Sequence, residues 1–259
     1  MNNVKETIHQ PVFLHNNINK KANTIDIYFS LIMRSLFFII FGTVFVAILS
    51  VNGAEQPLKE AEKWWPFQVV LANIISFIML THFLRKEKKS YISLFKTKRI
   101  GLKKSLKEFF LLVIVAVVSG AVPLYVFSYL FLGSIIPPDN MFQPLPVWAA
   151  LIALIIFPVS NALVELPTYI GYALPRLEQH YGSKWKPIIF AGMALALQHV
   201  FLPLIFDPSY MLWRFFSFIP MAIILGAIFL KTRRLSTIIM VHYLLDLQLI
   251  IQTFMYSIK

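Results

Sequence analysis

Four ionisable side chains stand in three otherwise apolar stretches of the second half of the chain. Glu165 lies in the first stretch, His199 lies in the second, and His242 and Asp246 lie in the third. A charged side chain in hydrocarbon costs roughly 2.5 kcal/mol or more, so each of these residues is a candidate for function. His242 and Asp246 are four residues apart, which places them on one face of a helix.

These residue types suit the activation of a water molecule for attack on an amide. A carboxylate in an apolar site can act as a general base near neutral pH, and two imidazoles can polarise a carbonyl or hold the water. The four side chains could also form a zinc site, because glutamate, histidine and aspartate are all zinc ligands. Pro167 cannot donate to the carbonyl of Leu163, so this carbonyl could face a water-filled pocket.

Each of the four residues also has a purely structural interpretation. Glu165 could hydrogen-bond to a neighbouring helix, Asp246 could pair with His242, and His199 could be a packing histidine. Their common depth favours a shared site instead. At about 1.5 Å per residue, all four lie roughly 9 to 18 Å from the inner ends of their predicted spans.

Other polar residues in the apolar stretches have simpler predicted roles. Arg34 and Arg214 lie close to the ends of predicted spans, so we expect their side chains to extend to the interface. Asn161 and Gln198 could line the same cavity or only bridge helices. Leu166 follows Glu165 and is turned about 100° from it, so we expect it to face lipid or a packed neighbour rather than water.

The composition is that of a membrane protein rather than a soluble one. Hydrophobic residues make up 58% of the chain and charged residues 14%, and the mean hydropathy is +0.70. A soluble domain has about 25% charged residues. The sequence has no cysteine, which excludes disulfides and thiol catalysis.

We therefore predict an all-α fold, a polytopic membrane helix bundle of about seven transmembrane helices, with eight as the alternative count. Residues 1–26 are a polar, cytoplasmic tail in this prediction, and residues 27–256 form a single bundle. The predicted spans are 27–51, 66–84, 109–132, 147–174, 187–206, 214–230 and 236–256.

The distribution of basic residues predicts the orientation in the membrane. Residues 85–107 contain ten lysines and arginines against one acid, Glu87, and further basic clusters follow the fourth and sixth spans. Basic loops stay on the cytoplasmic side, so we expect a multi-pass protein of the cell membrane with its N-terminus in the cytoplasm. The flanking spans make a nucleic-acid partner the weaker explanation of this charge, whereas anionic lipid headgroups would be attracted to it.

One segment of the chain resembles the CPBP family, the CAAX protease and bacteriocin-processing (Abi) proteins, which includes type II CAAX prenyl endopeptidases. Residues 171–177, GYALPRL, match the end of the family's first motif and fix its register. In that register Glu165 matches the first glutamate of the motif. Leu166 replaces the second glutamate, and Ile170 replaces the arginine.

The later motifs of the family match the other candidate residues. His199, with Leu195 before it, matches the second motif, and His242 with Asp246 matches the third; the resemblance covers about residues 147–250. It implies a bacterial-type intramembrane endopeptidase, a hydrolase acting on a membrane-associated peptide or protein. Glu165 would activate water, and His199, His242 and Asp246 would position it or stabilise the oxyanion, with a divalent metal such as zinc as the conceivable cofactor.

Two other functions remain open from the sequence alone. Without the second glutamate and the arginine of the first motif, the chain could be a catalytically silent CPBP-like scaffold that binds a partner membrane protein. A small transporter with a proton-linked Glu/His pair is the third interpretation. A protease would depend on Glu165 and both histidines, a scaffold would tolerate their loss, and a transporter would show solute flux.

Overall fold

A computed structural model describes residues 22–97 and 100–259 of the chain. Over these residues it is helical without any strand, which confirms the all-α membrane bundle. The predicted tail lies mostly outside the described residues, although its last residues belong to the first helix. The elements are α1 (Thr24–Val51), α2 (Pro57–Glu62), α3 (Trp65–Lys86), η2 (Tyr91–Phe95), α4 (Leu102–Leu132), η3 (Asn140–Phe142), α5 (Val147–Leu166), η4 (Pro167–Ala173), α6 (Leu174–Tyr181), α7 (Trp185–Gln198), η5 (His199–Phe201), α8 (Pro208–Thr232) and α9 (Leu235–Ser257).

Six helical segments of the described chain are long and apolar enough to cross a membrane, one fewer than predicted. The difference is the predicted span 187–206, in which α7 has only 14 residues. Such a helix extends about 21 Å, short of a hydrocarbon core of about 30 Å. Leu202 has an extended backbone because it precedes Pro203, and the residue before a proline disfavours the helical conformation.

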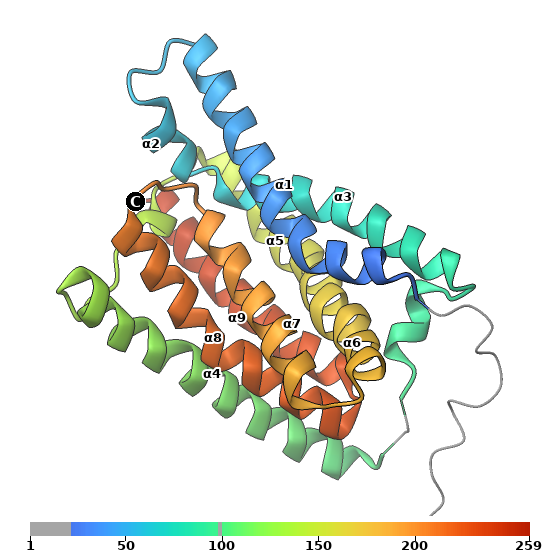
Figure 1. The fold of residues 1–259 in the computed structure, drawn as a ribbon. Helices are drawn as coiled ribbons and strands as arrows, with labels where there is room; N and C mark the ends of the chain where they lie inside the picture. The colour runs from blue at the N-terminus through green and yellow to red at the C-terminus, as the bar shows by residue number, and fades with distance from the viewer. Residues whose placement is uncertain (1–21, 98–99) are drawn as a thin grey trace, which may run out of the picture.

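The helices run alternately up and down through the bundle (Figure 1). Helix α5 packs against α3 and α9, α8 packs against α4 and α7, and α1 packs against α3. The loops after α3, α6 and α8 lie toward one end of the molecule, near the start of α1 (Figure 1). The short helix α7 follows the same alternation, since the loops on either side of it lie at opposite ends of the bundle.

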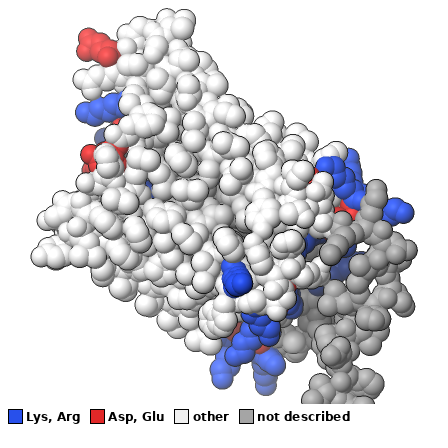
Figure 2. All heavy atoms as spheres, in the orientation of Figure 1, with Lys and Arg blue, Asp and Glu red and all other residues white. Residues whose placement is uncertain are grey.

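Most lysine and arginine side chains on the visible face gather at the end of these three loops (Figure 2). The opposite end carries few charges, and the surface between the two ends is almost free of charge on this face. A charge-free band between polar ends is the expected surface of a bundle that crosses a bilayer.

Helix α5 is at the centre of the packing because its buried face is lined with small side chains. Ala149, Ala150, Ala153 and Ala162 are all buried. Alanines let the backbones of neighbouring membrane helices approach closely. The helix continues into η4, a π-helix that begins at Pro167, and then into α6 without leaving the bundle. Glu165 therefore stands immediately before an irregular turn at the middle of the fold.

Candidate active site

The π-helical turn after Glu165 is stabilised by a side chain from the loop that follows α3. The hydroxyl of Tyr91 donates a 2.6 Å hydrogen bond to the carbonyl oxygen of Leu163. This is the carbonyl that Pro167 cannot serve, and the prediction that it faces a water-filled pocket is therefore wrong. A carbonyl without a donor is costly in hydrocarbon, and Tyr91 supplies this one with a hydrogen bond.

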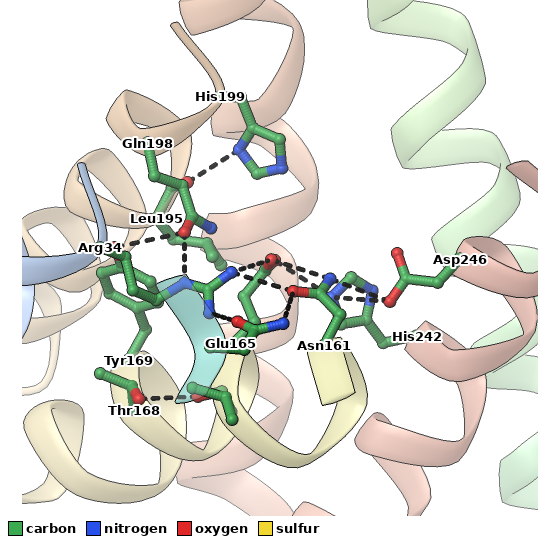
Figure 3. Close-up of polar contacts among 12 residues, drawn as sticks. Arg34, Asn161, Glu165, Thr168, Tyr169, Leu195, Gln198, His199, His242 and Asp246 are labelled. Atoms are coloured by element: carbon green, nitrogen blue, oxygen red, sulfur yellow. Dashed lines mark hydrogen bonds and ion pairs between the residues drawn. The ribbon is translucent and has the colours of Figure 1, made fainter. Parts of the chain in front are cut away.

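The two carboxylate oxygens of Glu165 have different partners (Figure 3). Oε1 lies 3.0 Å from Nε2 of His242. Oε2 accepts hydrogen bonds from Arg34 Nη2 at 3.2 Å and from Asn161 Nδ2 at 3.1 Å. Glu165 is only 5% exposed. A carboxylate can only accept, so His242 donates through Nε2 and its Nδ1 is an acceptor when the ring is neutral.

His199 reaches the same place from the end of α7. Its Nδ1 lies 2.9 Å from the carbonyl oxygen of Leu195, and one face of the ring stacks on Phe218 of α8 at a centroid distance of 3.6 Å. A carbonyl oxygen can only accept, so Nδ1 carries the proton. In the neutral ring Nε2 is then free to accept a hydrogen bond from a water molecule.

One small cavity joins these residues. It is lined by Glu165, Leu166, Leu195, His199, Phe218, Met221, Ala222, Leu225 and His242, and it offers about 10 Å³ to the centre of a water-sized sphere. That is room for about one water molecule. Leu166 lies on the cavity wall, so the prediction that it turns away from the water is wrong. Glu165 and Leu166 both belong to the regular helix α5, and the cavity extends from one side chain to the next.

Asp246, the fourth predicted residue, does not line this cavity. Its Oδ2 accepts a 3.0 Å hydrogen bond from Asn161 Nδ2 and lies 3.8 Å from His242 Nε2, too far for a hydrogen bond. Asn161 therefore bridges Asp246 to Glu165. Three of the four predicted side chains line the cavity. The fourth, Asp246, contacts Asn161, which in turn donates to Glu165.

Arg34 of α1 is the charged residue that the sequence reasoning misplaced. Its side chain is fully buried and does not extend to the interface. Nε donates to Gln198 Oε1 at 2.7 Å, Nη1 donates to Asn73 Oδ1, and Nη2 donates to Asn161 Oδ1 at 2.9 Å. A guanidinium in hydrocarbon needs such partners, and here the bundle interior supplies them.

Arg214 is likewise buried, which corrects the second prediction of an interfacial arginine. Nε donates to the carbonyl oxygen of His199 at 3.1 Å, and Nη2 donates to that of Leu202 at 2.9 Å. Both carbonyls lie in the backbone that follows α7, and that of His199 also accepts from the backbone N–H of Leu202 at 3.4 Å. A cation near the C-terminus of a helix is stabilised by the helix dipole. Arg214 therefore fixes the backbone that carries His199.

A signal for Arg34 was present in the sequence. Like Glu165, it is a charge within a long apolar run and is therefore a candidate for function. Asn73 is an amide in the second span and carries a weaker version of the same signal. Distance along the chain concealed both residues, because nothing in the sequence places them beside Glu165.

Comparison with protein families bears on the second half of this bundle. Residues 146–248 match the family model described as type II CAAX prenyl endopeptidase Rce1-like. This match, over less than half of the chain, supports a likeness of the segment to the CPBP/CAAX protease family. The Rce1-like segment contains all four predicted site residues, whereas Arg34 and Asn73 lie outside it. No curated protein and no solved structure matches the chain.

The Rce1-like site is not arranged as a metal centre. Among the described residues no group of three histidine, cysteine, aspartate or glutamate side chains is placed to hold a metal ion. One oxygen of Glu165 faces the guanidinium of Arg34. His199 Nδ1 is directed at a carbonyl oxygen, and Asp246 is outside the cavity. A cation beside a ligand carboxylate opposes a second cation, so these residues do not fit a zinc ion.

Proposed function

We propose that this protein is an intramembrane endopeptidase that hydrolyses a peptide bond in a membrane-associated peptide or protein. One observation supports the proposal above the others. Three of the four predicted residues that match the family's motifs, Glu165, His199 and His242, line one cavity of the size of a water molecule. An acid and two imidazoles around a single water are the groups that amide hydrolysis requires.

The proposed mechanism uses the hydrogen-bonding roles derived above. A water molecule in the cavity donates one hydrogen bond to Glu165 and one to His199 Nε2, which leaves an oxygen lone pair for the substrate carbonyl. Glu165 takes a proton from the water as the new carbon–oxygen bond forms. The same proton passes to the leaving nitrogen when the carbon–nitrogen bond breaks. His242 donates to Glu165 throughout and fixes its orientation.

Substitution of the base tests this proposal. Glu165→Gln keeps the shape of the side chain but removes the base, so hydrolysis should fall by on the order of 10²-fold or more. The matched control is Glu62→Gln, because Glu62 is also a buried acid but hydrogen-bonds to Asn140 and Gln143, distant from the cavity. Cleavage of a library of membrane-anchored peptides is measured at equal amounts of folded protein. Equal cleavage by wild type and Glu165→Gln would contradict the mechanism.

A silent scaffold is the second candidate, and the size of the cavity favours it. About 10 Å³ admits a water molecule but no peptide. A protease must therefore move part of the wall, for which α8 supplies Phe218, Met221, Ala222 and Leu225. Absence of cleavage on any substrate, with a partner-dependent phenotype that Glu165→Gln leaves unchanged, would establish the scaffold instead.

We propose that the protein resides in the cell membrane with its N-terminus in the cytoplasm. The gathering of basic side chains at the end where α1 begins supports this orientation (Figure 2). Seven passages, with α7 as the short one, would place Lys259 on the outer side. A tag fused after Lys259 should be reached by a membrane-impermeant reagent in intact cells, and protection of that tag would reverse the orientation.

A further inference from the structure

The matched segment alone does not complete the site, because a cation from the first helix enters it. Arg34 lies on α1, more than a hundred positions before the Rce1-like residues 146–248. Its side chain has no exposed surface, and its Nη2 lies 3.2 Å from Glu165 Oε2. The family resemblance expects an arginine at the position of Ile170, and Ile170 is a buried part of the apolar core.

The guanidinium is fixed on every side that faces the bundle. Its three nitrogens donate to side-chain oxygens on three different helices: Asn73 on α3, Asn161 and Glu165 on α5, and Gln198 on α7 (Figure 3). A planar guanidinium with all its nitrogens engaged has little freedom to rotate. Gln198 directly precedes His199, so the same arginine bonds to a side chain next to His199 and to Glu165 itself.

Both oxygens of the Glu165 carboxylate are restrained by hydrogen bonds. Arg34 and Asn161 occupy Oε2, and His242 occupies Oε1. These contacts set the plane of the carboxylate and leave the face on the cavity for water. They also supply the positive charge that a carboxylate buried in hydrocarbon requires.

We propose that Arg34 is the positioning residue for Glu165, supplied by α1 in place of the arginine absent at Ile170. The inference rests on the proposed hydrolysis by Glu165. Arg34 does not line the cavity, so it acts through the orientation and charge of Glu165. The catalytic unit of this protein therefore extends beyond the Rce1-like segment to α1.

The kinetic test compares Arg34→Gln and Arg34→Lys with wild type on a membrane-anchored peptide that wild type cleaves. Loss of the guanidinium should lower kcat by on the order of 10²-fold, the effect of a misplaced catalytic group, with KM within about twofold of wild type. Arg34→Lys keeps the positive charge but loses the planar guanidinium that bonds to several oxygens at once. Its kcat should therefore lie between those of wild type and Arg34→Gln. A kcat of Arg34→Gln within about twofold of wild type, per folded molecule, would overturn the proposal. So would a loss confined to KM.

A stability measurement separates this inference from the proposed function. Arg34→Gln leaves Glu165 as an unpaired buried charge, so it should lower the Tm in detergent, and addition of Glu165→Gln should recover part of that loss. Arg214→Gln is the matched control, since Arg214 is a buried arginine bonded to backbone carbonyls only, and Glu165→Gln should recover none of its loss. If Glu165→Gln recovers the same share of the Tm loss in Arg34→Gln and in Arg214→Gln, Arg34 is not specifically paired with Glu165. This conclusion would hold even if the protein proves to be a protease. If wild type cleaves nothing, the proposed hydrolysis fails and with it the catalytic role of Arg34, whereas recovery by Glu165→Gln would still establish the pair itself.

Discussion

The ring of Phe218 on α8 lies flat against the ring of His199, at a centroid distance of 3.6 Å and an interplanar angle of 10°. The guanidinium carbon of Arg214 also lies over this phenyl ring, 4.8 Å from its centroid. His199 thus has two restraints, the Leu195 carbonyl in its plane and Phe218 on its face. The histidine is oriented by α8, although it belongs to the end of α7.

Replacement of Phe218 by leucine should therefore reduce hydrolysis without preventing folding. The leucine keeps an apolar side chain on the cavity wall but removes the flat surface, so the imidazole can tilt away from the water. We expect kcat to fall on the order of 10-fold, since small displacements of a catalytic group carry large rate effects. Phe216→Leu is the control, because Phe216 contacts Phe127, Phe131 and Phe215 and does not line the cavity. Equal rates for the two variants would show that the stack is unimportant.

Introduction of a second acid at Leu166 should destabilise the protein in a pH-dependent way. Leu166 lines the cavity and is 1% exposed, so Leu166→Glu would place a carboxylate close to Glu165 with one guanidinium for both. Like charges in a dry site repel each other, and protonation of the added acid relieves the repulsion. The Tm of Leu166→Glu should lie below that of Leu166→Gln at pH 7, and the gap should narrow toward pH 5. A gap independent of pH would place the added side chain away from Glu165.

Gly171 of η4 packs against Leu235, the first residue of α9. A larger residue at this position should disturb the packing of α9, the helix that carries His242. A Cβ atom at Gly171 would come within 2.7 Å of Leu235 Cδ2. Leu235 is buried, so overpacking should cost about 1–3 kcal/mol and lower the Tm by several degrees. Gly226→Ala is the matched control, since its Cβ would meet neighbours at ordinary distances of 3.6 and 3.7 Å. A Gly171→Ala protein as stable as Gly226→Ala would contradict the expectation.

The contact between Glu87 and Arg176 should make stability sensitive to acid. Arg176 donates to both oxygens of Glu87 at 2.7 Å, and it is the arginine of the GYALPRL segment. Burial alone would raise the pKa of Glu87, but the hydrogen bonds and charge of Arg176 outweigh burial and lower this pKa below its ordinary value. A lowered pKa in the folded state means that the carboxylate contributes stability above the unfolded value of about 4.3.

This stability should be lost as the pH falls through the pKa of Glu87 in the folded protein. The measurement is the Tm of wild type and of Glu87→Gln from pH 7 to pH 3. Wild type should be the more stable at pH 7, and the two curves should converge in the acidic range. Glu55→Gln is the control, since Glu55 is exposed, and it should follow wild type at every pH. A constant difference between Glu87→Gln and wild type would assign the effect to packing instead of charge.

The order of the residues along the chain was sufficient to find much of this site. Glu165, His199 and His242 are rare polar residues in apolar runs, and their depth along the helices can be counted from the span ends. The sequence could not locate the guanidinium of Arg34 beside Glu165, because that contact joins α1 to α5. It also misjudged Leu166, because the cavity extends past Glu165 over the next residue of the same helix.

By itself the sequence determined that the chain is an all-helical membrane bundle and which acid and histidines could share a site. Hydropathy and helical rise are local quantities. Both can be obtained from the residues of one span, whichever helices pack against it. Only the tertiary structure decided that α7 is too short to count as a span by length, that Tyr91 serves the carbonyl of Leu163, and that Arg34 pairs with Glu165. These outcomes depend on which helices pack together, because a buried polar group takes whatever partner the neighbouring helix presents.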